Sequence, residues 1–426
     1  MILRVNKNFN TLKGIVTIPA DKSVSHRAVI FSSLAQGKSI IKNFSDGADP
    51  RSSLEICKQL GADINIDSST ITIVSDGNLK ATSQPLFCGN SGTTMRLMAG
   101  ILSGQNFDST LTGDESLSKR PMKRIIEPLS QMGAKITSND YRAPLEIKNS
   151  NLKAITYDLP IASAQVKSCI LLAGLFSDGT TTVNEICPSR NHTEIMLKHM
   201  GANINYSNNQ ISISKSNLSP LNIEIIGDIS SAAYFIAAGL LVPNSEIILK
   251  NVGLNPTRAG ILDVAQKMGA NVEILDKKEI CSEPVGDLKI KYTPSLQGCE
   301  ISGELIPKLI DEIPIIAVLA TQAQGQTVIK DAQDLRNKES DRIKTTVTEL
   351  KKLGAQIEET QDGMIIQGKT KLAGGICTDS YKDHRLAMSL YIAGLITDKE
   401  ISVNDFEWVN ISFPTFEKLI TELYFQ

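Results

Sequence analysis

The sequence predicts an α/β protein of six repeated units that are divided between two lobes. The first observation is a helix end followed by Gly-Ala and an alternating strand, which recurs at Gly61, Gly133, Gly201, Gly269 and Gly354. The second is a set of six segments of small and apolar residues, one in each unit. The unit recurs roughly every 70 residues, and self-similarity at a fixed period identifies a repeat architecture.

The Gly-Ala pairs predict the ends of surface helices in five of the six units. A residue just past a helix C-terminus often adopts the left-handed conformation, in which a Cβ is costly. We therefore expect a positive φ angle at each of these glycines. The surface helix of the sixth unit is expected at residues 413–423.

The apolar segments predict six buried helices, because they are apolar nearly all round whereas a surface helix has one apolar stripe. They cover residues 23–37, 91–104, 163–179, 230–244, 311–325 and 383–398. Short strands are expected after them, at residues 39–44, 109–113, 180–186, 245–252, 326–332 and 400–406. Each unit thus consists of a buried helix, a strand, a surface helix, a Gly-Ala turn and a strand pair.

Six buried helices are too many for one core in a chain of 426 residues. We expect two lobes of three units, with the break at Gly227 and Asp228, where the fourth unit opens. The first lobe is predicted to cover residues 20–227, and the second residues 1–19 and 228–426. Helix starts that converge on a cleft between the lobes would create an electropositive site without a net positive charge on the protein.

The composition excludes several classes of protein. With 41% hydrophobic residues, 21% charged residues and a formal net charge of -2, the chain does not resemble a nucleic-acid binder or a polybasic membrane anchor. The first ten residues lack a signal pattern, and no apolar run approaches the roughly 20 residues that span a bilayer, so we expect a cytoplasmic protein. The seven Cys are scattered without a CxxC spacing and the His number four, so neither a disulfide framework nor a metal site is expected.

Polar residues that differ between the units are the candidates for function, because structural repeats share their structural residues. At the starts of the buried helices they are Lys22, Ser23, Arg27, Arg96, Ser163, Gln165, Lys167, Asp311, Glu312, His384 and Arg385. In front of the surface helices they include Arg120, Arg190, Arg336, Lys338, Glu339 and Arg342.

The group from Arg336 to Arg342 has helical spacing, which would place opposite charges on one turn. Taken alone, it is equally typical of a solvated ion-pair face. Eight of the candidate cations favour a binding site over a solvated face, because their mutual repulsion at one cleft requires anionic ligands to offset it. They are Lys22, Arg27, Arg96, Arg120, Arg190, Lys338, Arg342 and Arg385. Two phosphorylated substrates would provide such ligands.

The stretch LFCGNSGTTMRLMAG, residues 86–100, has two interpretations. It is typical of a core helix whose first turn is capped by Ser91 and Thr93. A Gly-rich helix start also leaves backbone N–H groups that favour a bound anion, and Arg96 adds a two-pronged donor for phosphate or carboxylate. The spacing matches neither GxxxxGKS nor GxGxxG, so no nucleotide motif is implied.

The motifs DKSVSHR, GNSGTTMR, SKRPM, SAQVKS, RNKESDR and DHRLAM occur in this order along the full chain. This combination closely resembles the 5-enolpyruvylshikimate-3-phosphate synthase family. The resemblance implies a two-domain fold of six βαβαββ-like units that closes over shikimate 3-phosphate and phosphoenolpyruvate. It also implies transfer of the enolpyruvyl group to the shikimate 5-hydroxyl with release of phosphate, without a metal or an organic cofactor. We expect the protein to be a monomer.

The resemblance also implies roles for individual residues. The residues that match ligands of shikimate 3-phosphate are Lys22, Ser23, Arg27, Ser163, Ala164, Gln165, Arg190, Asp311 and Lys338. Those that match contacts of phosphoenolpyruvate are Lys22, Asn90, Gly92, Arg120, Gln165, Arg342 and Arg385. Asp311 matches the proton acceptor at the 5-hydroxyl, and Glu339 is similar to the carboxylate that moves a proton at the methylene carbon. Addition of an alcohol across an enol phosphate requires a base, an acid and cations, which are these residue types.

Departures from the family's commonest pattern indicate its second sequence class, whose members often tolerate glyphosate. Ser91, Thr94 and Leu97 stand where the commonest form GNAGTAMRP has Ala, Ala and Pro. Ser412 stands near the C-terminal Phe-Pro pair, where the first class has a Lys, so one phosphoenolpyruvate contact is expected to be missing or supplied differently.

Two alternatives remain at this point. The enolpyruvyl transferase that acts on UDP-N-acetylglucosamine shares the fold, but it relies on a loop Cys where this chain reads ESLSKRP. A non-catalytic scaffold that binds a phosphorylated metabolite is the other. Asp311 and Glu339 argue against it, because binding of polyanions alone gains nothing from carboxylates in the site.

Overall fold

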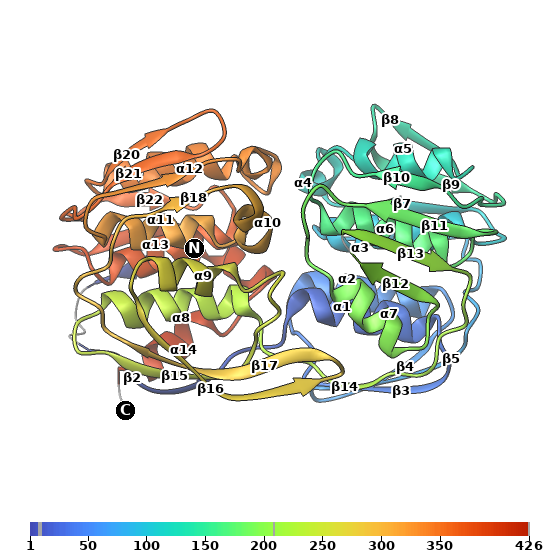
Figure 1. Ribbon diagram of the computed structural model, residues 1–426, viewed down its shortest axis with the longest axis horizontal. Helices are drawn as coiled ribbons and strands as arrows, with labels where there is room; N and C mark the ends of the chain where they lie inside the picture. Colours follow the sequence, from blue (N-terminus) through green and yellow to red (C-terminus); the bar gives the residue numbers. More distant parts are fainter. Residues whose placement is uncertain (7–10, 208, 425–426) are drawn as a thin grey trace. The chain divides into compact units, whose positions relative to one another are not determined.

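The computed structural model describes residues 1–6, 11–207 and 209–424. The chain forms two compact units (Figure 1). The first unit contains residues 1–19, 227–278 and 284–426, and the second contains residues 20–226 and 279–283. Within the described ranges, none of the helices has both the length and the hydropathy that crossing a membrane requires.

The second unit has three four-stranded sheets of one topology, in which the first two strands are parallel and the remaining pairs antiparallel. One sheet has the order β14 (Asn222–Glu224), β3 (Gln36–Lys42), β5 (Thr70–Asp76) and β4 (Asp63–Asp67). The next has the order β6 (Leu86–Phe87), β7 (Ser109–Thr112), β9 (Arg142–Lys148) and β8 (Lys135–Asn139). The third has the order β10 (Thr156–Asp158), β11 (Thr180–Asn184), β13 (Gln210–Ser214) and β12 (Ile204–Ser207).

The helices of the second unit follow the predicted alternation. Those with buried positions along most of their length are α1 (Lys22–Ser33), α3 (Gly92–Ser103) and α6 (Ala164–Gly174). The others are α2 (Ala48–Gln59), α4 (Glu115–Ser118), α5 (Lys123–Gln131) and α7 (His192–His199).

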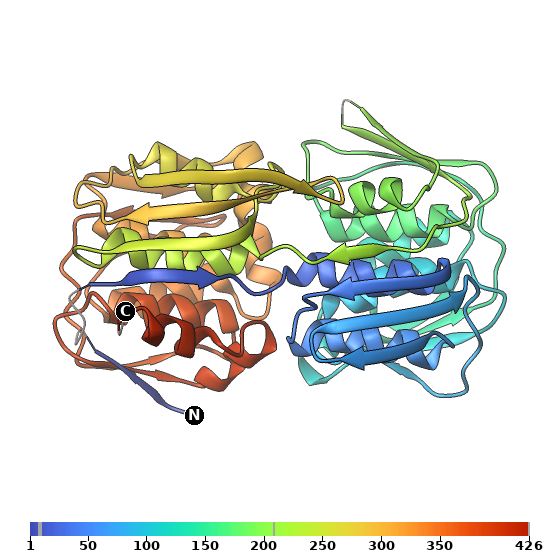
Figure 2. The same ribbon diagram turned by 90° about the horizontal axis from the view of Figure 1, so that it is seen from below.

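The part of the first unit that the structure describes also forms three sheets. One has the order β16 (Asn271–Ile280), β17 (Glu283–Lys291), β15 (Glu246–Gly253) and β2 (Lys13–Thr17). Another has the order β18 (Glu300–Ile301), β19 (Gln326–Ile329), β21 (Met364–Gln367) and β20 (Gln356–Glu359). The three-stranded sheet has the order β1 (Leu3–Val5), β23 (Ile401–Asn404) and β22 (Cys377–Asp379). Figure 2 shows β2 alongside β15, to which it is paired in parallel.

The buried helices of the first unit are α8 (Ile229–Leu241), α11 (Ile313–Gln322) and α13 (His384–Gly394). The remaining helices are α9 (Gly260–Lys267), α10 (Ile306–Leu309), α12 (Arg342–Lys352) and α14 (Phe416–Glu422). The described residues of this unit also form the 3-10 turns η1 (Gly303–Leu305), η2 (Gln333–Asn337) and η3 (Phe406–Ile411).

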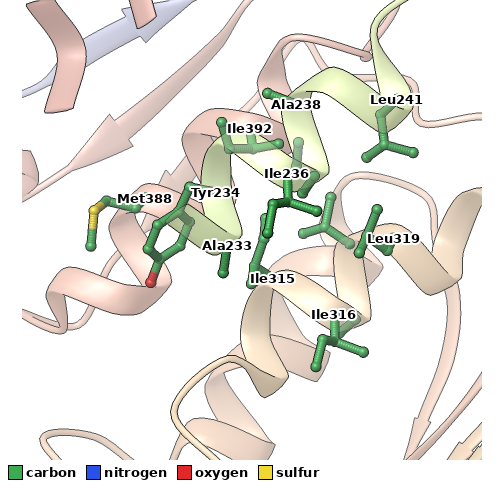
Figure 3. Packing of buried hydrophobic residues seen from close by; sticks show 14 of the residues in the cluster. Ala233, Tyr234, Ile236, Ala238, Leu241, Ile315, Ile316, Leu319, Met388 and Ile392 are labelled. Atoms are coloured by element: carbon green, nitrogen blue, oxygen red, sulfur yellow. The ribbon is translucent and has the colours of Figure 1, made fainter. Parts of the chain in front are cut away.

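The core of the first unit lies where the three buried helices meet (Figure 3). Ile236 of α8 points toward Ile315 and Leu319 of α11, and Tyr234 points toward α13 (Figure 3). Burying each large apolar side chain contributes about 1.5 to 3 kcal/mol. The prediction of six all-round apolar helices is confirmed, because nearly every residue of these helices beyond the first turn is buried.

The five Gly-Ala turns also form as predicted. Gly61, Gly133, Gly201, Gly269 and Gly354 have φ angles of +98°, +98°, +85°, +71° and +100°. At the first of these turns, the N–H of Gly61 donates to Lys58 and the N–H of Ala62 donates to Cys57, which satisfies carbonyl groups at the end of α2. These turns direct each chain segment from a surface helix into its strand pair.

Candidate functional site

In the first unit, the starts of α11, α12 and α13 bring charged side chains together. Asp341 caps α12 by accepting from the N–H of Lys344, at 3.1 Å, and Asp383 caps α13 by accepting from the N–H of Arg385, at 3.0 Å. Both caps follow the preference of helix N-termini for Asp. Arg342 and Arg385 are therefore held in the first turns of their helices.

Arg342 is the centre of this group. Its side chain is 1% exposed, and its Nη1 lies 3.1 Å from Asp311, its Nη2 2.5 Å from Glu339 and its Nε 2.8 Å from Asp383. Burial alone would lower the pKa of Arg342, but the surrounding carboxylates, Asp383 first, outweigh it and raise this pKa well above its ordinary value. The ion pair between Glu339 and Arg342 that the spacing predicted is present, although α12 begins only at Arg342.

Arg385 and Lys338 approach the same carboxylate. Asp311 lies 3.9 Å from Nη2 of Arg385 and 4.0 Å from Nζ of Lys338, and Glu312 lies 3.5 Å from Nη1 of Arg385. Lys338 also lies 3.4 Å from Asp334. Asp311, Glu339, Lys338, Arg342 and Arg385 therefore form one cluster, which we call the carboxylate–arginine cluster.

In the second unit, the start of α1 places two cations. Nζ of Lys22 lies 2.5 Å from Asp49, which stands in the first turn of α2. Arg27 is buried, and it donates to Thr193 at 2.7 Å, to Ser168 at 3.1 Å and to the carbonyl of Ser23 at 2.9 Å. Residues from α1, α6 and α7 thus fix the Arg27 side chain.

The Gly-rich stretch forms β6 and the start of α3. Ser91 caps α3 by accepting from the N–H of Thr94, as the capped-helix interpretation predicted. The cap predicted for Thr93 is wrong, because its Oγ1 accepts instead from Nε2 of Gln165, at 2.9 Å. Arg96 donates to Oε1 of the same Gln165, at 2.6 Å, so the amide is held from both ends.

Gly92 lies next to the guanidinium of Arg96. A Cβ on Gly92 would lie 2.6 Å from Nη1 of Arg96 and 3.7 Å from Nη1 of Arg120. Any side chain there would displace the Arg96 guanidinium, because real Cβ atoms do not approach other atoms that closely. The absence of a side chain thus preserves the bond between Arg96 and Gln165.

Asn90 connects Arg120 to a capping carboxylate. Nη2 of Arg120 donates to Oδ1 of Asn90, and Nδ2 of Asn90 donates to Asp114, both at 2.7 Å. Asp114 also caps α4 by accepting from the N–H of Leu117. The amide orientation of Asn90 is therefore set by one donor and one acceptor.

The remaining candidates lie around α6 and α7. Ser163 is the N-cap residue of α6, Ala164 and Gln165 begin that helix, and Arg190 lies two residues before α7. Lys167 was a candidate cation, but its side chain is fully buried and pairs with Glu185 at 2.9 Å and Glu194 at 2.7 Å. Lys167 therefore has a structural role in joining α6, α7 and the segment before α7.

The capping or pairing carboxylates Asp49, Asp114 and Asp383 were not among the predicted binding or catalytic residues. Asp383 and Asp114 could have been found as Asp residues preceding a helix start. Asp49 carries no such local signal, because its contact with Lys22 depends on how α1 packs on α2. Among residues 1–6, 11–207 and 209–424, no three His, Cys, Asp or Glu side chains come together as a group that could hold a metal ion.

The arrangement suits acid–base chemistry on phosphorylated molecules. Guanidinium groups form strong two-pronged bonds with phosphate and carboxylate oxygens. The carboxylate–arginine cluster adds two carboxylates within hydrogen-bonding distance of one guanidinium, and carboxylates are common acids and bases in catalysis.

Comparison with known proteins gives a consistent result. The family model described as EPSP synthase (3-phosphoshikimate 1-carboxyvinyltransferase) matches residues 7–420. The 3-phosphoshikimate 1-carboxyvinyltransferase of Thermodesulfovibrio yellowstonii is 52% identical, with 99% of each chain covered, and that of Bacillus subtilis is 51% identical, with 97% of each covered.

Solved structures extend the comparison to the fold. EPSP synthase from Acinetobacter baumannii has a TM-score of 0.89 and 41% identity, with 99% of this chain and 98% of that chain covered. The enolpyruvyl transferase NikO from Streptomyces tendae has a TM-score of 0.81 at 18% identity, with 99% and 97% covered, which is a likeness of fold alone. These structures confirm the predicted α/β fold with its six small sheets.

Proposed function

Since the chain belongs to the EPSP synthase (3-phosphoshikimate 1-carboxyvinyltransferase) family, we propose that the cations described above bind the two substrates of that reaction. The enzyme transfers the enolpyruvyl group of phosphoenolpyruvate to the 5-hydroxyl of shikimate 3-phosphate and releases phosphate. This is a step in the shikimate pathway to the aromatic amino acids. The relatives at about half identity favour this reaction over transfer to UDP-N-acetylglucosamine.

Shikimate 3-phosphate is proposed to bind mainly to the second unit. The proposed ligands are Lys22, Ser23, Arg27, Ser163, Ala164, Gln165 and Arg190, together with Asp311 and Lys338 of the first unit. The fixed position of Arg27 supports this assignment, because its bonds to Thr193, Ser168 and Ser23 hold a guanidinium ready for a phosphate group. A preorganised cation loses little conformational entropy when the ligand binds.

Phosphoenolpyruvate is proposed to bind to Lys22, Asn90, Gly92, Arg120, Gln165, Arg342 and Arg385. The two amide side chains in this set are already oriented by arginines, Gln165 by Arg96 and Asn90 by Arg120. The small ligand carries a phosphate and a carboxylate, and each can accept two parallel bonds from a guanidinium.

For catalysis, we propose that Asp311 takes the proton of the 5-hydroxyl as its oxygen attacks C2 of phosphoenolpyruvate. Glu339 delivers a proton to the methylene carbon, which gives a tetrahedral adduct. Elimination then breaks the C2–O bond to phosphate, while Glu339 takes a proton back from the new methyl group and Asp311 returns its proton to the leaving phosphate. The C=C double bond is thereby restored, now as an enol ether. The charge of the Lys22 ammonium offsets negative charge that develops on the transferring group.

One observation carries this assignment: Arg342 holds Asp311 and Glu339 on two different nitrogens of one guanidinium. Two carboxylates at one cation supply the base and the acid that addition requires. A scaffold that only bound anions would be weakened by both, because they repel phosphate and compete for the arginine.

Phosphate release tests the reaction directly. Release that requires both substrates together supports the transferase, and release from phosphoenolpyruvate alone contradicts it. For the residue roles, Arg385→Lys is expected to raise the KM for phosphoenolpyruvate more than tenfold, because one bond of a charged pair contributes about 1.5 to 3 kcal/mol. Arg4→Lys is the matched control, since Arg4 is exposed and its Nε lies 3.9 Å from Glu400. Equal kinetics for the two variants would contradict the role of Arg385.

We also propose that the protein acts as a monomer in the cytoplasm. The proposed ligands all come from one chain, so a partner subunit is not required to complete the set. Sedimentation at micromolar concentration with both substrates present would test the monomer, and a dimeric mass would contradict it.

A further inference from the structure

We propose that Asp383 is a positioning residue that sets the orientation of Arg342. This inference rests on the proposed role of Arg342 in binding phosphoenolpyruvate. Asp383 belongs to no substrate-binding or catalytic set described above. It acts through the arginine rather than on the substrate.

Asp383 and Arg342 form a two-pronged pair in the interior. The Asp383 side chain is 0% exposed; its Oδ2 accepts from Nε of Arg342 at 2.8 Å, and its Oδ1 accepts from Nη2 at 3.2 Å. Parallel bonds along one edge of the guanidinium fix its plane as well as its position. A single bond would leave the plane free to rotate.

The carboxylate is itself fixed by two further donors. Oδ1 accepts from the backbone N–H of Arg385 at 3.0 Å, and Oδ2 accepts from Oγ of Ser340 at 3.0 Å. Asp383 is thus bound to the first turn of α13 and to the segment just before α12. The guanidinium of Arg342 consequently takes its position from the start of α13 rather than from its own flexible stem.

The remaining donors of Arg342 then have defined directions. Nη1 points to Asp311 at 3.1 Å, and Nη2 also reaches Glu339, at 2.5 Å. Without Asp383, the guanidinium would lose the two bonds that fix its plane, so its Nη1 and Nη2 donors would no longer be held in the directions that we assign to phosphoenolpyruvate. The loss of Asp383 should therefore weaken binding of this substrate more than binding of shikimate 3-phosphate.

The central test is Asp383→Asn, which keeps the shape of the side chain but removes its charge and one acceptor. The KM for phosphoenolpyruvate is expected to rise roughly tenfold to a hundredfold, which is the range expected for the loss of one hydrogen bond between charged groups. The KM for shikimate 3-phosphate should stay within about twofold, a difference that a general loss of stability would not produce.

Asp341→Asn is the matched control. Asp341 is also a helix-capping Asp paired with an arginine, since it caps α12 and lies 2.9 Å from Arg336. Asn caps helices about as well as Asp, so both variants keep their caps. Both KM values of Asp341→Asn should stay within about twofold of wild type, because this pair does not include Arg342.

A double-mutant cycle with Arg342→Lys separates the positioning role from an independent one. If Asp383 acts through Arg342, then Asp383→Asn should add less than about threefold to the KM of Arg342→Lys, because the two sites are coupled. The proposal would be overturned if the double variant raised the KM for phosphoenolpyruvate by the product of the factors seen in the two single variants. Should Asp383→Asn fail to fold, Ser340→Ala removes one donor to the same carboxylate and is expected to raise the KM for phosphoenolpyruvate roughly threefold, within the range of one lost hydrogen bond.

The outcomes also separate this inference from the proposed function. An unchanged KM for phosphoenolpyruvate in Arg342→Lys would overturn the role proposed for Arg342. A raised KM in Arg342→Lys with an unchanged one in folded Asp383→Asn and Ser340→Ala would overturn the positioning role alone. Equal rises in KM for both substrates in Asp383→Asn would overturn it as well.

Discussion

Asp311→Asn tests the role of Asp311 as the base without removing the binding residues that surround it. In the structure, Asp311 faces three cations, with Arg342 at 3.1 Å, Arg385 at 3.9 Å and Lys338 at 4.0 Å. The closest of these contacts is a hydrogen bond to Oδ1, which an amide oxygen can also accept. The substitution should therefore leave Arg342 nearly in place while removing the group proposed to take the proton.

The size of the effect follows from this geometry. Loss of a general base costs roughly 10²-fold to 10⁴-fold in rate, which corresponds to about 3 to 5 kcal/mol in the activation free energy. Replacing one bond between charged groups by one to a neutral acceptor should lower the free energy of unfolding by only about 1 kcal/mol. The effect on kcat should thus greatly exceed the effect on stability.

The assay is phosphate release at saturating concentrations of both substrates, combined with calorimetric titration of shikimate 3-phosphate. Asp287→Asn is the control, since Asp287 is a buried carboxylate of the same unit that pairs with Lys250 and accepts from the N–H of Asn251. We expect a large fall in kcat for Asp311→Asn alone, with binding of shikimate 3-phosphate retained within about tenfold. A kcat within tenfold of wild type would refute the role of Asp311 as the base.

Three further changes test other features. Gly92→Ala places a Cβ 2.6 Å from Nη1 of Arg96, so it should disrupt the bond between Arg96 and Gln165. The KM for phosphoenolpyruvate should rise with little change in melting temperature, and an unchanged KM would contradict this. Burial, and then the charges of Lys22 and Arg27, hold the pKa of His26 well below 6.5, so the folded state loses about 1.4 kcal/mol of stability per pH unit as pH falls below about 6.5. Urea unfolding at pH 7.5 and 5.5 should show a smaller loss for His26→Gln, and equal losses would argue against this cause. For Asp228, burial opposes ionisation, but Arg258 and Arg385 outweigh it and hold the pKa at about 2. Above pH 4, this carboxylate therefore contributes about 2 kcal/mol to the free energy of unfolding, and the contribution disappears as pH falls toward 2. The stability difference between wild type and Asp228→Asn should therefore shrink between pH 5 and pH 2, and a constant difference would exclude this contribution.

The helices and turns of this protein follow from the amino acids of single short segments. The left-handed turn at Gly61 depends on the conformational freedom of one residue, and the burial of α8 depends on apolar residues on every side of one helix. Both properties belong to short segments, so they could be predicted from the segments alone. The six motifs identified the family for the same reason, because each is a short and specific string of residues.

The pairing of residues that are distant in sequence depends on the complete fold. Asp383 binds Arg342 across 41 positions of the chain, and Thr93 accepts from Gln165 rather than capping its own helix. The strand β2 precedes α1 in the sequence yet pairs with β15, more than 200 residues later. These choices depend on which elements pack together, and packing energy is summed over contacts distant in sequence, so no single segment contains it. The sequence could therefore indicate a cluster of cations and carboxylates, while the fold determined which carboxylate orients which arginine.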